Sequence, residues 1–269
     1  MRFDMHCHTK EGSMDGQIPL KEYVIHLKKL GFDGMLITDH NSYKAHQYYM
    51  KHRNEPEFQN FTVLKGIEYD TCDSGHILVI MPEDICLPIL ELRGLPVKVL
   101  IKIVHAFHGI LGPAHPMGEK YLSLTNCKYY KKHPEIIKEF DFVEIYNSCE
   151  SFQANREAAY LAEKYHLPGT GGSDAHKIRC AGMAYTDIDA DIVTESDLIR
   201  YMKTAPAASC GGSHYSGTTR EHLKTAYNLL LGLFYLYNKC SNYYYRSRRE
   251  MEMKAILASI PLLSSQKNL

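Results

Sequence analysis

The sequence lacks a charge imbalance, because lysine plus arginine and aspartate plus glutamate both number 31. A chain without net charge has no overall positive field to attract it to nucleic acids or anionic membranes. The sequence also lacks any run approaching the roughly 18 consecutive apolar residues of a membrane-spanning helix. These absences argue against a membrane-spanning protein and against a long nucleic-acid partner.

CxxC pairs are also absent, although the chain has eight cysteines. The cysteines are scattered, at positions 7, 72, 86, 127, 149, 180, 210 and 240. Free thiols are typical of a reducing compartment, so we expect a cytoplasmic protein. Cys7 and Cys149 are near candidate site residues in the sequence, but we expect both to be buried structural thiols.

Short apolar runs alternate with helical patterns over the first 205 residues. The expected strands are 3–6, 34–38, 61–68, 75–80, 110–115, 142–147, 169–172 and 184–188, and the expected helices are 20–30, 42–52, 97–108, 153–165 and 195–203. Strands that alternate with helices of about 12 residues indicate βα units and a parallel sheet. The length and the number of units favour an α/β fold, a distorted (βα)7 TIM-like barrel, over an open sheet.

The composition changes in the C-terminal part, and we assign 206–269 to a helical extension packed on the barrel domain 1–205. A Gly/Ser-rich stretch leads into helical segments expected at 220–239 and 250–262. The run LLLGLFYL at 229–236 is apolar enough to require burial, against the barrel or against a partner. A membrane-surface role also fits this basic, aromatic tail, although helix packing explains the same residues.

Two pairs of candidate metal ligands are present, His6 with His8 in the first strand region and Asp174 with His176 far downstream. Side chains at positions i and i+2 of a strand point to the same side. Each pair therefore presents two ligand groups on one face. Imidazole and carboxylate together suit zinc, manganese or iron.

Further candidate ligands lie at or near the ends of other expected strands. They are Asp15, His40, Glu68, His76 and His115. In βα barrels the chemistry is located where the strands lead into the following loops. We therefore expect these residues to gather at one end of the barrel, whereas the other nine histidines fall mostly in helices or in the tail and are expected to be surface or structural residues.

The order of these motifs resembles the PHP superfamily, named for polymerase and histidinol phosphatase. The matching segments are MHCHTKEGSMDG, ITDHN, KGIEYD, GHIL, GPAHP, EIYN and GGSDAH, which together span residues 1 to about 190. The resemblance implies a distorted seven-stranded βα barrel with two or three divalent metal ions (Mn, Zn or Fe) at its strand ends.

The resemblance also implies which residues hold each ion. The first ion would be held by His6, His8, Glu68 and Asp174. The second would share Glu68 and add His76 and His115. The third would be held by Asp15, His40 and His176, with Asp15 at a position where several family members have histidine.

Two ions bridged by Glu68 would lower the pKa of a shared water toward neutral, and the resulting hydroxide would attack phosphorus in line. The ions would also neutralise charge on the equatorial and leaving oxygens. The predicted catalytic residues are Glu68, Asp174 and Arg179, and the arginine has the fork geometry that binds phosphate. The other candidates for binding the substrate phosphate are Lys10, Lys120 and Asn147.

The favoured function is metal-dependent hydrolysis of a small phosphomonoester or a nucleotide. A nuclease that trims short oligonucleotides from the 5′ end is a close alternative within the same family. Amidohydrolases also have an HxH in the first strand, but Glu68 and His176 favour the phosphoesterase. A non-catalytic metal-binding barrel is the third class, and the complete set of ligands argues against it.

Overall fold

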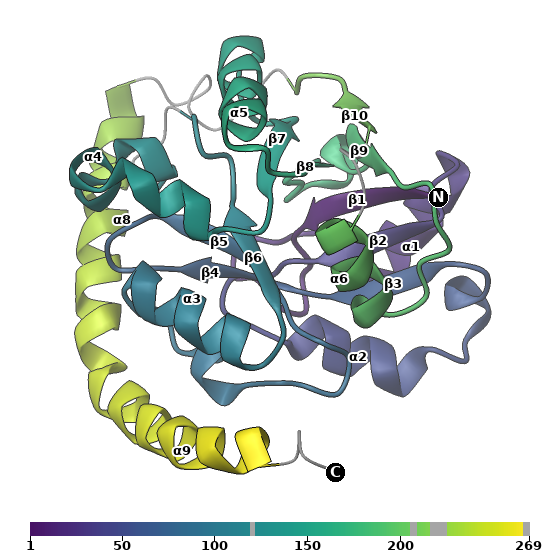
Figure 1. Ribbon diagram of the computed structural model, residues 1–269. Coiled ribbons are helices and arrows are strands. Elements are labelled where there is room, and N and C mark those ends of the chain that lie inside the picture. Colours follow the sequence, from purple (N-terminus) through teal and green to yellow (C-terminus); the bar gives the residue numbers. More distant parts are fainter. Residues whose placement is uncertain (119–121, 205–208, 216–224, 266–269) are drawn as a thin grey trace.

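The computed structural model describes residues 1–118, 122–204, 209–215 and 225–265, and the strands among them form three hydrogen-bonded sheets (Figure 1). The first sheet has the order β10-β9-β1-β2-β3, with β1 (Arg2–Cys7), β2 (Gly34–Ile37), β3 (Thr62–Lys65), β9 (Ala184–Asp187) and β10 (Ser209–Gly212). The second contains β4 (Ile67–Asp70), β5 (His76–Ile80) and β6 (Ile110–Pro113), and the third β7 (Val143–Asn147) and β8 (Gly169–Gly172).

The α/β class predicted from the sequence is confirmed, but no closed barrel forms among the described strands. Strands β1, β2 and β3 are parallel, and β7 is parallel to β8. In contrast, β4, β5 and β6 are antiparallel neighbours, and β9 is antiparallel to both β1 and β10. The described strands therefore combine parallel and antiparallel pairs instead of the predicted repeat of parallel βα units.

The short connection between β4 and β5 explains the antiparallel sheet. Thr71 N–H donates to Gly75 O at 3.0 Å, and Gly75 has a φ of +71°, a conformation that favours glycine. A parallel partner would require a crossover of about a dozen residues, so a turn this tight returns the chain antiparallel. As a result Asp70 pairs directly with His76 across the ladder.

Isolated bridges join the sheets where the strands end. Cys7 pairs with Ala175, which links the end of β1 to the segment after β8. His40 pairs with Glu68, which links the segment after β2 to β4. These two bridges bring the segments that carry the candidate ligands to one place.

The helices of the body pack through apolar stripes. They are α1 (Leu20–Lys29), α2 (Lys44–His52), α3 (Val97–Ala106), α4 (Lys128–Lys132), α5 (Phe152–Tyr165) and α6 (Glu195–Thr204), with short 3-10 turns η1 (Pro56–Phe58), η2 (Pro88–Glu91), η3 (Leu124–Asn126), η4 (Pro134–Glu139) and η5 (Ile178–Cys180). In α1 the buried positions Leu20, Val24 and Leu27 follow helical spacing. The Ser151 hydroxyl caps α5 by accepting from Ala154 N–H.

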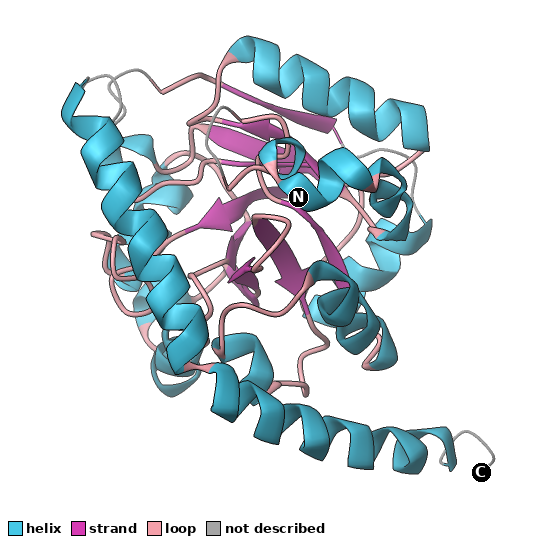
Figure 2. Cartoon of the chain, turned by 90° about the vertical axis from the view of Figure 1, so that its left-hand side faces the viewer, coloured by secondary structure: helices cyan, strands magenta, loops and turns pink. Residues whose placement is uncertain are grey.

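Two long helices follow the body, α8 (Thr225–Tyr244) and α9 (Arg246–Ser265), and they extend along one side of it and below it (Figures 1 and 2). Both were expected, but α8 ends later and α9 begins earlier than predicted, and the first predicted residues, 220–224, lie outside the described residues. The described leucines of the apolar run, Leu229, Leu233 and Leu236, are 69%, 55% and 57% exposed, so they are not buried against the body of this chain. Their burial against a partner stays a prediction. Ile256 of α9, in contrast, is buried in the hydrophobic core.

None of the helices in the described ranges combines the length and the apolar character that crossing a membrane requires.

Candidate metal centre

The paired histidines of β1 lie against two carboxylates at the strand ends. His6 Nε2 is 3.4 Å from Glu68 Oε2 and 3.7 Å from Asp174 Oδ1. His8 Nε2 is 3.2 Å from the same Glu68 oxygen and 3.3 Å from the same Asp174 oxygen. All four side chains are buried. Four ligand atoms of the first predicted group therefore converge on one point.

The alternation of β1 produces this arrangement. Asp4, His6 and His8 are two residues apart, so they extend to the same side of the strand. Asp4 accepts hydrogen bonds from the backbone N–H of Ser173 at 2.8 Å and from its hydroxyl at 2.6 Å. These bonds fix the segment that follows β8, where Asp174 adopts a left-handed backbone with a φ of +52°. The carboxylate of Asp174 is thus held opposite the two imidazoles.

The second oxygen of Glu68 faces two other histidines. Glu68 Oε1 is 2.8 Å from His76 Nδ1 and 3.1 Å from His115 Nε2. Since Oε2 faces His6 and His8, the single carboxylate lies between two groups of imidazoles. The Glu68 side chain is only 1% exposed. This is the position that a carboxylate bridging two cations would require.

The third predicted group is closer to solvent. Asp15 Oδ2 is 3.1 Å from His176 Nε2 and 3.7 Å from His40 Nε2. The ring of His8 stacks on those of both His176 and His40, with centroids 4.3 and 4.7 Å apart. Asp15 is about half exposed, whereas the histidines are largely covered. The structure therefore brings all nine sequence-predicted metal ligands together.

Glu144 and Asp70 also contact these groups, and sequence reasoning missed both. Glu144 accepts from His6 Nδ1 at 2.8 Å and from the backbone N–H of His115 at 2.6 Å. Asp70 Oδ1 is 3.1 Å from His76 Nε2 and 3.4 Å from His40 Nδ1. The i, i+2 rule that pairs His6 with His8 also pairs Glu68 with Asp70 on β4, so a signal was present.

The predicted phosphate-binding residues are not brought together in the same way. Asn147 is buried, and its Nδ2 donates to Asp174 Oδ2 at 3.3 Å and to Glu144 Oε2 at 3.1 Å. Arg179, on η5, packs its guanidinium 5.3 Å from the ring centre of Tyr215. Lys10 is exposed, and Lys120 lies outside the described residues. Their roles toward substrate stay predictions.

The electrostatics of the centre reflect carboxylates packed among imidazoles. Burial lowers the pKa of His8, but Asp174 and Glu68 raise it to about 9. Burial also lowers the pKa of His40, which Glu68 and Asp70 raise to about 10. Burial raises the pKa of Glu68, but the histidines around it bring that pKa well below its usual value. The carboxylates thus favour positive charge on His8 and His40, whereas burial lowers the pKa of His76.

These residues fit divalent cations. The side chains form four groups, and within each group the ligand atoms of His, Asp and Glu lie within 4.8 Å of one another. Two groups contain Glu68, one contains Asp15, and the fourth consists of His40, Asp70 and His76. His40 Nδ1, Asp70 Oδ1 and both ring nitrogens of His76 are buried without a hydrogen bond of good geometry. Buried polar atoms without such partners are rare in proteins, and metal coordination satisfies them.

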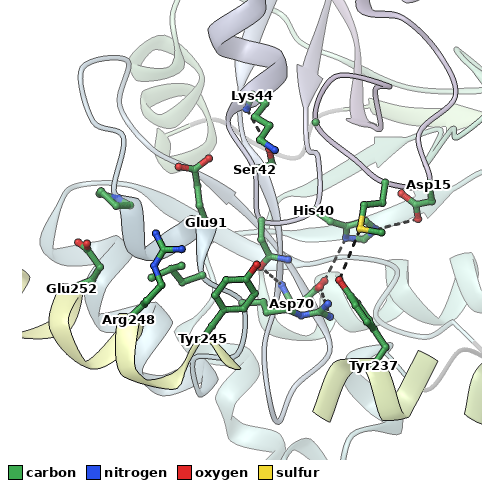
Figure 3. A pocket seen from close by; sticks show the side chains of 16 residues that line it. Asp15, His40, Ser42, Lys44, Asp70, Glu91, Tyr237, Tyr245, Arg248 and Glu252 are labelled. Atoms are coloured by element: carbon green, nitrogen blue, oxygen red, sulfur yellow. Dashed lines mark hydrogen bonds and ion pairs between the residues drawn. The ribbon is translucent and has the colours of Figure 1, made fainter. Parts of the chain in front are cut away.

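A cavity of about 750 Å³ opens beside the third group (Figure 3). Asp15, His40 and Asp70 line it from the body. Its other walls come from the region between Asn41 and Lys44, from η2 and the loop after it, and from the C-terminal helices. The side chains from the C-terminal part are Tyr237, Tyr245, Arg248 and Glu252. A cavity of this size suits a small-molecule ligand.

Comparison with protein-family models identifies the chain. The model described as the PHP domain matches residues 4–165, and a model described as PHP-associated matches residues 152–205. The chain belongs to the PHP family. This membership confirms the resemblance drawn from the order of the motifs. No curated protein matches the chain in a sequence search.

Solved structures share the fold of this PHP protein at low sequence identity. A candidate metal-dependent phosphoesterase from Bifidobacterium adolescentis has 16% identity and a TM-score of 0.54, covering 65% of this chain and 87% of its own. The lesion-specific endonuclease PfuEndoQ from Pyrococcus furiosus also has 16% identity and a TM-score of 0.54, with coverages of 78% and 58%. An amidohydrolase from Chromobacterium violaceum, solved with bound SO4 and no metal, has 12% identity and a TM-score of 0.54, with coverages of 74% and 96%.

Proposed function

We propose that this PHP protein is a metal-dependent phosphoesterase that hydrolyses a small phosphomonoester or a nucleotide. The observation that carries the proposal is the position of Glu68. Its two oxygens face separate groups of imidazoles at 2.8–3.4 Å, as in a site that holds two cations close together. Such pairs of cations are typical of phosphoryl hydrolysis.

The chain's own residues would hold the reacting groups in place. His6, His8 and Asp174 would hold one cation, His76 and His115 a second, and Asp15, His40 and His176 a third. When bound, the ions would supply a water acidic enough to attack phosphorus at neutral pH and positive charge for the phosphoryl oxygens. Glu144 keeps His6 in one ring orientation, and Asn147 holds the Asp174 carboxylate.

The cavity favours a small substrate over a long one. It borders the candidate ligands Asp15 and His40, and Tyr237 and Arg248 line it from the C-terminal helices (Figure 3). Its volume of about 750 Å³ lies within the range of pockets for small molecules. A phosphate that reaches the ions through this cavity would leave the rest of the substrate against α8 and α9.

Two basic side chains that line the cavity are candidates for binding anionic parts of the substrate. They are Lys44 of α2 and Arg248 of α9. Within the described residues, neither side chain forms an ion pair or a hydrogen bond, and both are exposed. Arg179 does not line this cavity, so Lys44 and Arg248 join it as candidates for the phosphate.

Two other reactions use related structures. Because an endonuclease is among the structural neighbours, hydrolysis of a short oligonucleotide is the second candidate function. Because an amidohydrolase is also among them, C–N hydrolysis is the third. At 16% and 12% identity these neighbours share the fold alone. Glu68 between two imidazole groups and a third group with His176 favour phosphoester hydrolysis over C–N hydrolysis. The small cavity favours a small ester over an oligonucleotide.

The proposal is tested by a screen of phosphate release from phosphorylated metabolites and short 5′-phosphorylated oligonucleotides, with manganese, zinc or iron added. We expect release from at least one small ester and none from a His8→Ala variant. If no phosphoester is cleaved with any metal while metal analysis shows full occupancy, the protein is a metal-binding module and the proposal fails.

A further inference from the structure

Asp70 connects two histidines that belong to different candidate metal groups. Its Oδ1 is 3.1 Å from His76 Nε2 and 3.4 Å from His40 Nδ1. The opposite nitrogen of His76 faces Glu68 at 2.8 Å, and that of His40 faces Asp15 at 3.7 Å. His76 therefore presents one nitrogen to the predicted bridging carboxylate Glu68 and the other to Asp70. His40 Nδ1 lies between Asp70 Oδ1 and Glu68 Oε2, which is 3.2 Å away. A carboxylate behind a metal-binding histidine fixes its tautomer and the orientation of its ring.

Arg93 holds the other oxygen of Asp70. Its Nη2 is 2.6 Å from Asp70 Oδ2, and both side chains are about nine-tenths buried. The backbone strengthens this link, because Gly94 N–H donates to Asp70 O at 2.8 Å. A guanidinium this close disfavours a further cation at Asp70. With Arg93 on Oδ2, Asp70 keeps Oδ1 for the two imidazoles, and we take it as a positioning carboxylate. A direct ligand role in the group of His40, Asp70 and His76 is the alternative that the metal-binding test below decides.

The C-terminal helices hold Arg93 in turn. Its guanidinium donates to the Asn238 side chain of α8 and lies 5.2 Å from the ring centre of Tyr237. Its backbone carbonyl accepts from the guanidinium of Arg249 on α9. Gly94 has a φ of +98°, and a Cβ at this position would collide with the Asn242 side chain. The loop and the two helices are therefore in close contact.

We propose that the C-terminal helices stabilise the metal centre through Arg93 and Asp70, with Asp70 as the positioning residue for His40 and His76. The chain of contacts runs from α8 and α9 to Arg93, then to Asp70, then to the two imidazoles. The proposal rests on the proposed function only for the identity of the metal ligands. In this proposal α8 and α9 support the metal-binding histidines and do not only cover the body.

Metal affinity of the full chain tests this proposal without any substrate. We expect Asp70→Asn to bind the same number of cobalt ions with 10- to 100-fold lower affinity in competition with a chelator, and with an altered visible spectrum. Arg93→Met should weaken binding by about tenfold, with Arg93→Lys between this variant and wild type, because lysine keeps the charge without the fork. Asn238→Ala should lower the affinity by a few-fold.

Arg246→Ala is the matched control, because Arg246 pairs with Glu250 on the same helix. It should bind cobalt like wild type. Thermal melting in chelator shows whether each variant folds. If a variant at Arg93 does not fold, Asn238→Ala still tests the contact between the helices and the metal centre. Loss of one full equivalent in Asp70→Asn would make Asp70 a direct ligand and overturn the positioning role. Wild-type affinity in both the Arg93 and Asn238 variants would overturn the role of the helices.

These outcomes are separate from those of the proposed function. A wild-type protein that binds cobalt in the expected way but cleaves no phosphoester would contradict the phosphoesterase assignment alone. A protein that cleaves phosphoesters, with metal affinity unchanged in all variants, would contradict the coupling alone.

Discussion

The strand ends of the body and the C-terminal helices place charged residues in opposite settings. At the strand ends, His6, His8 and Glu68 are at most 1% exposed and lie within 3.4 Å of one another. On α9, Arg246 and Glu250 form an ion pair with both side chains more than 60% exposed. Exposed pairs contribute about 0–1 kcal/mol, whereas a buried charge that loses its partner costs about 3–5 kcal/mol. Buried, crowded charge therefore indicates function, whereas an exposed ion pair such as Arg246 with Glu250 does not.

The largest effect is expected from Glu68→Gln, which removes the buried carboxylate between the two groups of imidazoles. The amide can no longer bridge two cations, so about two equivalents of metal should be lost. Phosphate release should fall by at least roughly a thousandfold, because both ions act on the same reacting group. Metal analysis and a phosphate assay measure the two effects. Glu250→Gln in the exposed ion pair is the control. Equal losses in both variants would contradict the functional difference between buried and exposed charge.

The second effect concerns Asp15→Ala, at the more exposed edge of the centre. We expect the loss of one equivalent of metal, with the ions at Glu68 retained, since Asp15 contacts only His40 and His176 among the predicted ligands. Phosphate release should fall by about 10- to 100-fold, the usual range for a disturbed metal site. Asp189→Ala, at an exposed aspartate, is the control. An unchanged metal content would remove the third site.

The third prediction concerns Arg248→Ala, which tests whether the helices contribute to substrate binding. We expect KM to rise by about tenfold with kcat within a factor of two, because one charged contact to substrate is worth about 1.5–3 kcal/mol. The assay is steady-state hydrolysis of the best ester from the screen. Arg246→Ala is the matched control, since Arg246 does not line the cavity. If kcat falls and KM does not change, Arg248 acts on the chemical step and not on binding.

The smallest effect is expected from pH. The pKa of His8 is raised to about 9 and that of His40 to about 10 in the metal-free protein. A histidine with a raised pKa stabilises the fold fully below its unfolded value of about 6.5 and loses this contribution as pH rises through the folded value. The melting temperature in chelator should therefore fall by a few degrees between pH 6.5 and 9.5.

Metal should reverse that dependence, because bound imidazole must be neutral and cations displace the protons. The rise in melting temperature on adding metal should thus be larger at pH 9 than at pH 6.5. Thermal melting with and without chelator measures both curves. Parallel curves with and without metal would contradict protonation of the imidazoles in the metal-free centre.

The nine candidate metal ligands could be named from the sequence because their signals are local, and the structure brings them together. His6 and His8 share a face by the period of a strand, and Asp174 with His176 repeats the pattern. The order of the motifs then matched the PHP family. Asp70 and Glu144 were missed, because their importance depends on which strands are neighbours and in which register they pair.

The sequence by itself determined the alternating strands and helices, the two C-terminal helices and the chemical types of the candidate ligands. These follow from side-chain period and turn chemistry, which act over a few residues. The tertiary packing determines that the described strands form three sheets rather than a closed barrel, and the tight turn after Asp70 makes β5 antiparallel to β4. It also decided that Tyr237 and Arg248 share a cavity with Asp15 and His40, because contacts between residues so far apart in the chain depend on the packing of whole elements.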